Sequence, residues 1–234
     1  MSQPRRAEAK RGARKKAVAE QAEKAQPEKA RAAGRLSVDW SVAHRSMSSG
    51  TRSGDQHLVR ETPDGSVLLA VVDGLGHGEE AAAAAQWAVE ILDRHAGEPV
   101  TTLLKRCHER LRETRGVVLS LAAYDGAQER LTWLGVGNVE GVLLRSAKGI
   151  IGGFERLLLR GGVVGSRLPE LREETLPIFA GDILILITDG VDSLFGVSPR
   201  AGSIKEMADG ILERHGKATD DALVLVARFA LAER

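Results

Sequence analysis

The sequence predicts an α+β fold in which strands and helices pack in layers. Strand-like apolar segments occur in groups, and the helix-like segments stand as one pair and one single helix between these groups. Alternating βαβ units would instead place a helix after nearly every strand. We therefore expect a layered sandwich, and the sequence shows no internal repeat.

The predicted strands are apolar or alternating runs bounded by turn-forming residues. A Ser/Gly-rich turn over 48–54 separates the first two strands, and Asp125-Gly126 and Gly137-Asn138 separate three later ones as in antiparallel hairpins. In chain order, the strand predictions are 36–45, 57–61, 66–72, 117–124, 130–136, 139–146, shorter pieces near 155–160 and 172–177, 182–188 and 222–229.

Three helices are predicted from apolar residues at helical spacing. The first follows a Gly-rich turn and begins with Glu79 and Glu80, whose charges suit the positive end of a helix. The second has Pro99 in its first turn, where a proline loses no helical hydrogen bond, and carries Cys107 on its apolar stripe. The third covers residues near 203–214.

The bulk composition allows one well-buried core, since 43% of the 234 residues are hydrophobic. Cys107 is the only cysteine, which excludes an intrachain disulfide framework and a multi-thiolate zinc site. No apolar run approaches the roughly 20 residues that a membrane-spanning helix needs. The charged N-terminus is not followed by the apolar segment of a secretory signal, so we expect a cytoplasmic protein.

The charges are distributed unevenly along the chain. Residues 1–35 hold 11 Lys/Arg and 4 Asp/Glu, whereas residues 36–234 hold 22 basic and 28 acidic residues. The first stretch has almost no large apolar side chain and cannot build a core. We therefore expect 1–35 to be a basic, disordered extension and 36–234 to be the folded domain. The extension is either a solvated tail or a contact to an acidic partner, and its lack of aromatic side chains disfavours nucleic acid.

Two buried strands share one design, an apolar run that stops at Asp-Gly. They end at Asp73-Gly74 and at Asp189-Gly190, while Asp55 and the pair at 220–221 occupy similar positions at strand edges. One such dipeptide alone is a common turn. Several carboxylates that converge repel one another unless a cation neutralises them, and all-oxygen sites suit Mg²⁺ or Mn²⁺. Two such ions can generate a hydroxide and clamp phosphate oxygens during in-line attack.

As an ordered set, these motifs resemble the signature blocks of the PP2C-type serine/threonine phosphatases. The blocks are Asp73-Gly74-Leu75-Gly76-His77-Gly78, Ile187-Thr188-Asp189-Gly190 and Thr219-Asp220-Asp221. The chain is most similar to the bacterial SpoIIE-like branch, and within it to the small RsbX-like stressosome phosphatases. Three further segments carry the likeness to that group: Lys105-Arg106-Cys107, Arg115-Gly116 and Gly135-Val136-Gly137-Asn138-Val139. The resemblance covers roughly residues 50–230.

The resemblance implies a four-layer αββα sandwich of PP2C type, in which helices flank two antiparallel sheets. It also implies a centre with two Mn²⁺ or Mg²⁺ ions, where Asp73 bridges both ions and Gly74 offers its backbone carbonyl. Asp189 and Asp220 would hold one ion, and Asp55 would serve the second directly or through water. The implied nucleophile is a metal-bound hydroxide, so no phospho-enzyme is expected.

Two assignments within this site stay open. Asp220 matches the motif better than Asp221, which is the alternative ligand. Many PP2C enzymes place a histidine directly after the first Asp-Gly, where this chain has Leu75. His77 follows two residues later, and it is either the general acid or a residue that shapes the turn. The expected catalytic residues are therefore Asp73, Asp189 and His77.

Competing interpretations of the same residues fit less well. In a dinucleotide fingerprint that starts at Gly74, the last glycine would fall on Glu79. A cysteine-based phosphatase needs an arginine six positions after its nucleophile, and six after Cys107 is Glu113.

The tryptophans are expected in the core, at positions 40, 87 and 133.

The resemblance implies an enzyme that dephosphorylates a STAS-domain component of the stressosome, scaffold or antagonist, and resets a bacterial stress response. One alternative is an RsbU- or SpoIIE-like phosphatase of an anti-anti-sigma factor. Another is a non-catalytic binding module that keeps the PP2C fold, although the presence of all the expected metal ligands argues against it. We expect no membrane partner, and contact with nucleic acid only through the basic extension.

Overall fold

The computed structural model describes residues 36–47, 52–147, 150–192 and 202–232. Residues 36–230 form one compact unit, and the description concerns that unit. The predicted basic extension over 1–35 and part of the turn predicted over 48–54 lie outside the described residues. Among the described helices, none is long and apolar enough to cross a membrane.

The order of the elements follows the order predicted from the sequence. Both strands that precede the helix pair extend further than predicted, so Asp55 and Asp73 lie inside strands rather than beside them. In chain order the elements are β1 (Leu36–Arg45), β2 (Asp55–Glu61), β3 (Val67–Gly74), α2 (Glu79–Arg94), α3 (Val100–Arg110), β4 (Val117–Asp125), β5 (Arg130–Val136), β6 (Glu140–Ala147), β7 (Ile150–Arg156), β8 (Leu159–Arg160), β9 (Glu174–Pro177), β10 (Ile183–Ile187), α4 (Ile204–His215) and β11 (Ala222–Leu231).

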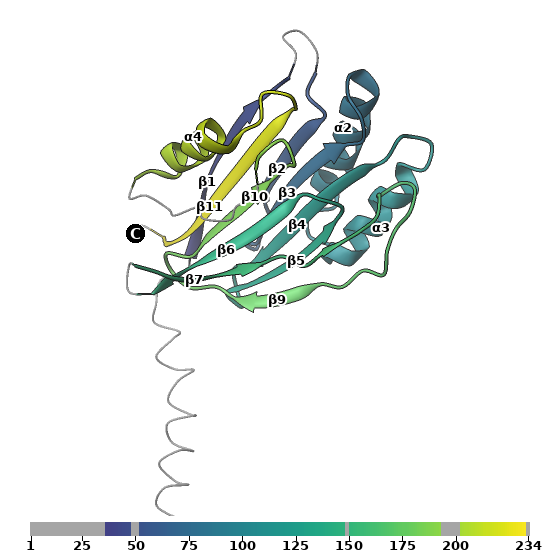
Figure 1. Cartoon of the computed structure of the whole chain (residues 1–234). Helices are drawn as coiled ribbons and strands as arrows, with labels where there is room; N and C mark the ends of the chain where they lie inside the picture. The colour runs from purple at the N-terminus through teal and green to yellow at the C-terminus, as the bar shows by residue number, and fades with distance from the viewer. Residues whose placement is uncertain (1–35, 48–51, 148–149, 193–201, 233–234) are drawn as a thin grey trace, which may run out of the picture. The chain divides into compact units, whose positions relative to one another are not determined.

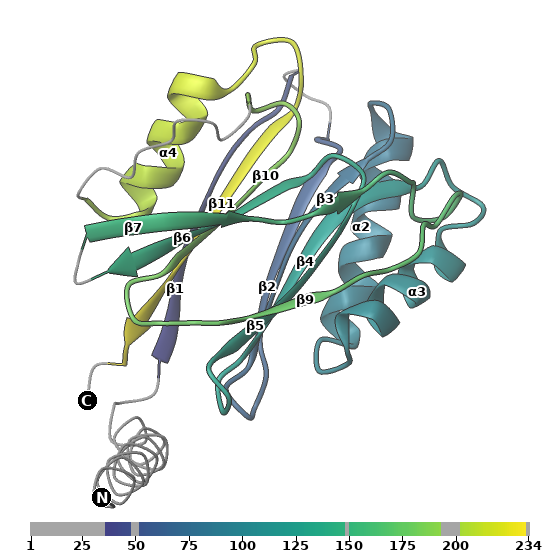
Figure 2. The same cartoon turned by 60° about the horizontal axis from the view of Figure 1, so that its bottom comes forward.

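The strands form two sheets that face each other (Figures 1 and 2). Sheet A has the order β1-β11-β10-β6-β7, and sheet B has the order β2-β3-β4-β5, with β8 and β9 both paired to β5. The registered strand pairs are antiparallel, except that β8 runs parallel to β5.

One predicted hairpin is wrong. The hairpin at Asp125-Gly126 is present, because β4 and β5 pair in antiparallel register. At Gly137-Asn138, however, the chain leaves sheet B and enters sheet A, where β6 pairs with β10 and β7. Both flanking strands are largely buried, so the local apolar pattern does not specify which neighbour each strand takes.

The helices cover the outer faces of the two sheets and complete the predicted αββα layers (Figure 2). Helices α2 and α3 pack on sheet B, and α4 packs on sheet A. A third cluster fills the space between the sheets. Strand β3 is apolar on both faces: Leu68, Ala70 and Val72 face the helices, while Leu69 and Val71 face sheet A.

The helix ends agree with the sequence signals. Glu79 and Glu80 occupy the first turn of α2, and Pro99 is the residue directly before α3. Ser203 caps α4, where its hydroxyl accepts a hydrogen bond from the backbone N–H of Glu206.

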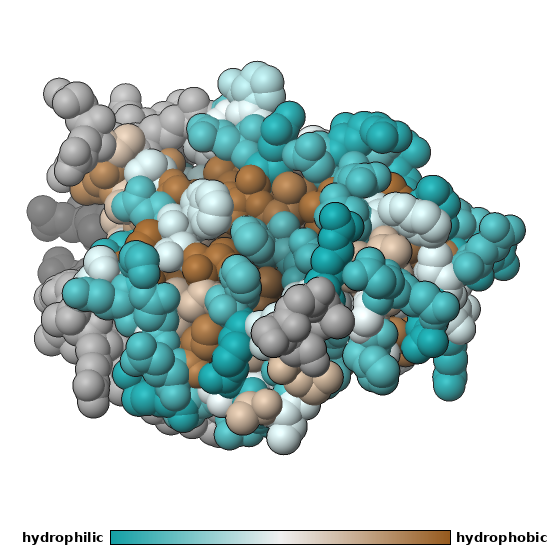
Figure 3. All heavy atoms as spheres, turned by 90° about the horizontal axis from the view of Figure 1, so that it is seen from above, coloured by the Kyte–Doolittle hydropathy of each residue, from teal (hydrophilic) through white to brown (hydrophobic). Residues whose placement is uncertain are grey.

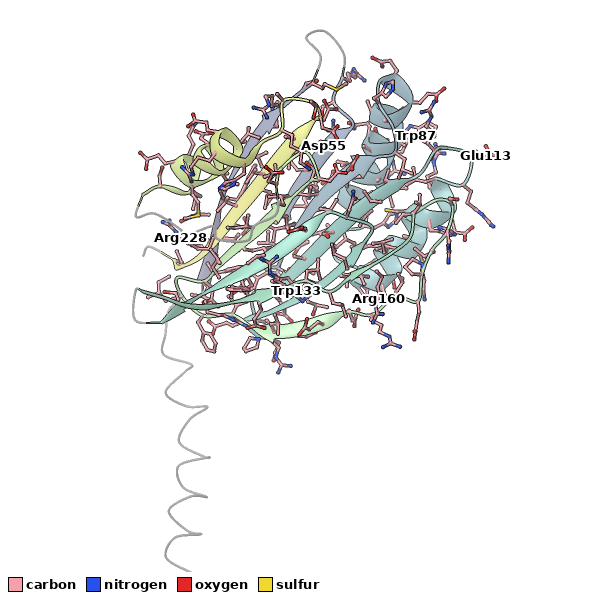
Figure 4. The ribbon with its side chains drawn as sticks, viewed as in Figure 1. Asp55, Trp87, Glu113, Trp133, Arg160 and Arg228 are labelled. Atoms are coloured by element: carbon pink, nitrogen blue, oxygen red, sulfur yellow. The ribbon has the colours of Figure 1, made fainter. Side chains whose placement is uncertain are left out.

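Only part of the tryptophan expectation holds. Trp133 is 1% exposed and packs between the sheets, and Figure 4 labels it within the strands. Trp87 is partly buried under the guanidinium of Arg110, 4.3 Å from its ring. For Trp40 the expectation is wrong, because this side chain is 46% exposed on β1, where a strand at the end of a sheet leaves part of its surface open.

Candidate metal centre

A cluster of carboxylates lies at one end of the sandwich, where strands of both sheets begin or end. Asp55 opens β2 and Asp73 is the last residue but one of β3. Asp189 follows β10 by two residues, and the pair at 220–221 directly precedes β11. Figure 4 labels Asp55 near the upper ends of the strands, and Figure 3, seen from above, shows apolar surface framed by hydrophilic side chains. Segments far apart in sequence thus bring acidic groups to one end of the fold.

The two-residue period of the strands explains why these side chains converge. On β3, the alternate residues Leu69 and Val71 belong to the core between the sheets, and Asp73 continues the same face. Asp55 is the direct cross-strand partner of Asp73. Both carboxylates therefore point into the space between the sheets, and Asp55 is only 7% exposed.

The two glycines of the Asp-Gly motifs allow backbones to approach closely. A Cβ atom on Gly74 would lie 2.1 Å from the carbonyl oxygen of Ala81 in α2. A Cβ atom on Gly190 would lie 1.7 Å from the carbonyl oxygen of Asp221. Neither glycine has a positive φ, so a simple turn does not account for them. Because any side chain would clash at these two positions, glycine lets the segment after Asp73 pack against α2 and the segment after Asp189 pack against Asp221.

Burial, together with the neighbouring carboxylates, raises the pKa of Asp55 and of Asp73. Burial is the largest cause and raises the pKa of Asp55 to about 7, with further contributions from the carboxylates at 221, 189 and 220. Burial likewise raises the pKa of Asp73 to about 8, and Asp55 is the next largest cause. The neighbouring charges that raise both values are all negative. A bound cation would neutralise these negative charges, so the cluster is a candidate cation site.

Thr188 holds Asp55 in position across the two sheets. Its hydroxyl donates a hydrogen bond to Oδ2 of Asp55 at 2.7 Å and accepts one from the backbone N–H of Leu223 at 2.9 Å. Thr188 is 1% exposed, so the bond is shielded from water. The sequence motif contains this residue, but the motif by itself assigned it no role.

Asn138 is a second supporting residue that sequence reasoning missed. Its side-chain N–H donates a hydrogen bond to Oδ2 of Asp189 at 2.7 Å. Lys217 donates from Nζ to the backbone carbonyl of Asp189 at 2.6 Å. Asn138 stands where the chain crosses between the sheets. Its sequence signals were a Gly-rich turn and a segment that carries the family likeness, and neither assigned it a role.

Asp220 and Asp221 have different surroundings. The carboxylate of Asp221 accepts hydrogen bonds from the backbone N–H groups of Met47 and Gly54 at 2.7 and 2.8 Å. These bonds and those from nearby serines outweigh burial and lower its pKa. Asp221 therefore ties the start of β11 to the connection between β1 and β2. The Asp220 carboxylate is exposed and accepts a bond from the N–H of Asp221, which leaves it freer to bind an ion.

His77 lies in the turn between β3 and α2, where its side chain is exposed. Arg115 packs over the same turn: its guanidinium would be 2.8 Å from a Cβ on Gly76, and its Nε lies 2.6 Å from Glu80. The backbone N–H of Leu75 donates to the carbonyl of Gly116 at 3.1 Å. The turn is thus fixed to the segment before β4.

The donor atoms of the cluster are carboxylate oxygens, which suit hard cations. Within the described ranges, no three His, Cys, Asp or Glu side chains stand close enough to hold one ion by themselves. Mg²⁺ commonly keeps several waters and is bound through one or two carboxylates. The residues present, all oxygen donors, therefore fit Mg²⁺ or Mn²⁺ better than an ion enclosed by protein ligands.

Comparison with protein families matches residues 63–230 to the family described as Stage II sporulation protein E (SpoIIE). Among characterised proteins, phosphoserine phosphatase RsbX of Bacillus subtilis (strain 168) is 24% identical over 179 residues, covering 76% of this chain and 87% of that protein. The range matched to the family includes every carboxylate of the cluster except Asp55.

Solved structures share the fold. A structure from work on the bacterial stressosome, described there as a modular system adapted to control secondary messenger signalling, has a TM-score of 0.73 and 30% identity, covering 82% of this chain and 99% of that one. RsbX in complex with magnesium has a TM-score of 0.72 and 20% identity, covering 82% and 96%. The catalytic domain of the phosphatase PstP with two manganese ions has a TM-score of 0.60 and 20% identity, covering 83% and 99%. The αββα arrangement described above is therefore the PP2C-type fold.

Proposed function

Because the chain belongs to the SpoIIE family and is a protein serine/threonine phosphatase of the PP2C type, we propose that it dephosphorylates a STAS-domain component of a bacterial stressosome and so resets a stress response. We expect this to occur in the cytoplasm. The observation that carries the catalytic part is the carboxylate cluster, in which Asp55 is buried and Asp73 half-buried, and the neighbouring charges that shift the pKa of each are negative. The likeness to RsbX and to the stressosome-related structure supports the choice of substrate.

We assign two divalent ions, Mn²⁺ or Mg²⁺, to this cluster. Asp73 would serve both ions and Gly74 would offer its backbone carbonyl. Asp189 and Asp220 would hold one ion, and Asp55 would serve the second directly or through water. Asp221 stays the alternative to Asp220, although its hydrogen bonds to the connection between β1 and β2 favour a structural role. The magnesium and manganese ions in two structures of the same fold support this choice of metal.

The protein's own residues prepare the site before a phosphate arrives. Thr188 fixes the orientation of Asp55, and Asn138 fixes that of Asp189, so little reorganisation is needed when ions bind. When bound, the ions activate water at neutral pH and neutralise phosphate oxygens. His77 is the candidate that would donate a proton to the leaving serine oxygen, because it stands on the exposed turn after Asp73.

Hydrolysis of p-nitrophenyl phosphate tests the catalytic part. The protein should hydrolyse it with Mn²⁺ or Mg²⁺ and lose this activity in EDTA. Asp189→Asn should abolish turnover, whereas Asp39→Asn, which removes an exposed carboxylate on β1, should not. No turnover with any divalent ion would favour a non-catalytic binding module.

A second experiment tests the substrate. The protein is incubated separately with a serine-phosphorylated stressosome scaffold and with a phosphorylated anti-anti-sigma factor, and phosphate release is followed for each. Faster release from the scaffold supports the proposed function. Faster release from the anti-anti-sigma factor supports the alternative.

A further inference from the structure

An open pocket of about 690 Å³ adjoins the carboxylate cluster on one side of the sandwich. Asp55 belongs to both the cluster and the pocket lining. From there the lining continues over His44 on β1, Gln56 and His57 on β2, and Gln86 and Glu90 on α2. We call this surface the side groove. It leads directly away from the site where phosphate would react.

The floor of the side groove contains a free strand edge. Strand β2 is the last strand of sheet B and has β3 as its one neighbour in the described part of the sheet, and β1 is likewise the last strand of sheet A. In Figure 2, β7 and β9 lie toward the viewer, and β1 and β2 lie behind them. In a strand of this kind, about half of the backbone N–H and C=O groups point away from the sheet. These groups can pair with another extended chain.

The two walls of the groove come from different layers. On one wall, His44 extends from β1. Trp40 of the same strand lies outside the lining, with its ring 6.1 Å from that of His57, which does line the groove. On the other wall, Gln86 and Glu90 are exposed on α2 and share a 3.2 Å hydrogen bond. Both walls offer hydrogen-bonding side chains: Glu90 adds a negative charge on the α2 side, and an aromatic ring stands beside the β1 side. Trp40, which is 46% exposed, offers apolar surface to a bound chain.

The charges of the groove indicate a polypeptide rather than a nucleic acid. Among the described residues that line the groove, Arg52 is the one arginine and none is a lysine, while Asp55 and Glu90 carry the opposite charge. A phosphodiester backbone needs several cations to replace its counterions. An extended peptide instead needs main-chain partners and shallow side-chain pockets, which a strand edge between two walls supplies.

We propose that the side groove binds the polypeptide segment next to the phosphorylated serine or threonine of the protein substrate, as an added strand along β2. The proposal rests on the proposed phosphatase function, since it uses the phosphate position to set the register of the segment. The phosphorylated residue lies at Asp55, where β2 begins, and the flanking residues follow the strand toward Glu61. The groove thereby distinguishes a phosphoprotein from a small phosphate ester.

Variants that fill the groove test this proposal. Gln86→Trp fills it from the α2 wall, and His44→Trp fills it from the β1 wall, so the proposal stays testable if one of them fails to fold. Lys105→Trp is the matched control, because Lys105 is equally exposed on α3 and does not line the groove. For each protein, kcat/KM is measured with a serine-phosphorylated STAS-domain protein and with p-nitrophenyl phosphate. Circular dichroism verifies that each variant is folded.

The expected result is selective. The groove variants should lose about tenfold or more in kcat/KM for the phosphoprotein, which corresponds to about 1.4 kcal/mol of transition-state binding, and keep their rate on the small ester. Lys105→Trp should change neither rate. An unchanged rate on the phosphoprotein in both groove variants, or an equal loss on both substrates, would overturn the proposal. If the unaltered protein hydrolyses neither substrate, the proposed function fails instead.

Hydrogen exchange tests the strand pairing independently of turnover. The metal-free protein is mixed with the same phosphoprotein, and exchange of the backbone amides of residues 55–61 is followed. Pairing along β2 should slow the exchange of about every second amide in this strand, and Gln86→Trp should reverse the effect. Unchanged exchange in β2 together with measurable binding would place the contact elsewhere on the protein and overturn the proposal.

Discussion

Replacing Asp55 by asparagine removes a buried carboxylate that repels the half-buried carboxylate of Asp73 in the metal-free protein. Asparagine has nearly the same shape, and its amide oxygen can still accept the hydrogen bond from Thr188. The substitution also removes the nearest negative charge that raises the pKa of Asp73. We therefore expect Asp55→Asn to stabilise the metal-free protein while it weakens metal binding.

The size and the sign of this effect depend on pH. The pKa of Asp55 is raised by burial from 3.8 to about 7, so the folded state holds a proton that the unfolded state releases. Below pH ~4 both states are protonated, and the carboxyl costs no stability. Between about pH 4 and pH 7 the protein loses stability as the pH rises, and the loss then levels off. The shift of about 3 units corresponds to about 4 kcal/mol at most.

The gain on substitution should be smaller than this limit. A buried asparagine amide also loses its hydration, so we expect about 2 kcal/mol at pH 8. Urea unfolding in EDTA at several pH values from 4 to 8 measures the free energy of unfolding of both proteins. The difference should favour the unaltered protein by about 2 kcal/mol near pH 4 and the variant by about 2 kcal/mol above pH 7, because the pKa shift of Asp55 changes it by about 4 kcal/mol. Asp192→Asn, an exposed carboxylate, is the control and should show no such trend.

Addition of Mn²⁺ should reverse the order. Ions that bind the folded state stabilise the unaltered protein by mass action, and the variant should gain less. The reasoning is refuted if Asp55→Asn is less stable than the unaltered protein at pH 8 in EDTA, or if the gap does not change with pH. Either result would mean that the ionised carboxylate of Asp55 does not destabilise the folded, metal-free protein.

Three further predictions concern the groups that support the cluster. Thr188→Val removes the hydroxyl that orients Asp55 and should cost about 1–3 kcal/mol of stability in urea, while Thr188→Ser should keep most of it. Asn138→Ala removes a hydrogen bond to a proposed ligand and should raise the Mn²⁺ concentration for half-maximal activity about 10-fold or more, measured by metal titration. In Gly190→Ala the new Cβ would lie 1.7 Å from a backbone oxygen, so the free energy of unfolding should fall by at least ~2 kcal/mol. Gly161→Ala has open space at its Cβ and should change it by less than about 1 kcal/mol. Equal losses would contradict the packing described for the Asp-Gly motif.

Much of the fold could be predicted because the apolar patterns are strong and local. The buried strands over 66–72 and 182–188 read as uninterrupted apolar runs, and both are strands in the structure. The turn at Gly137-Asn138 could not be predicted in the same way. A tight turn leads equally well to the adjacent strand of one sheet or to the facing sheet, and the choice depends on packing between layers rather than on the turn residues.

In the candidate site, the acidic residues could be predicted from the sequence and the residues that support them could not. The aspartates at 55, 73, 189 and 220 were visible in the sequence, because each stands at the edge of an apolar strand next to glycine or a second aspartate. Their supporting residues were not visible. Thr188 and Asn138 are ordinary polar residues until the two sheets stack and bring them within hydrogen-bond distance of Asp55 and Asp189.

By itself, the sequence determined the layered fold class, the order of the elements and the set of acidic residues available for a metal. These follow from periodicity and composition, which are properties of neighbouring residues. The tertiary structure alone decided which carboxylates lie together, and that Asp221 rather than Asp220 accepts hydrogen bonds from the connection between β1 and β2. It also decided that a groove adjoins Asp55 beside a free strand edge. These depend on contacts between residues as far apart as positions 55 and 188, and no local pattern encodes such contacts.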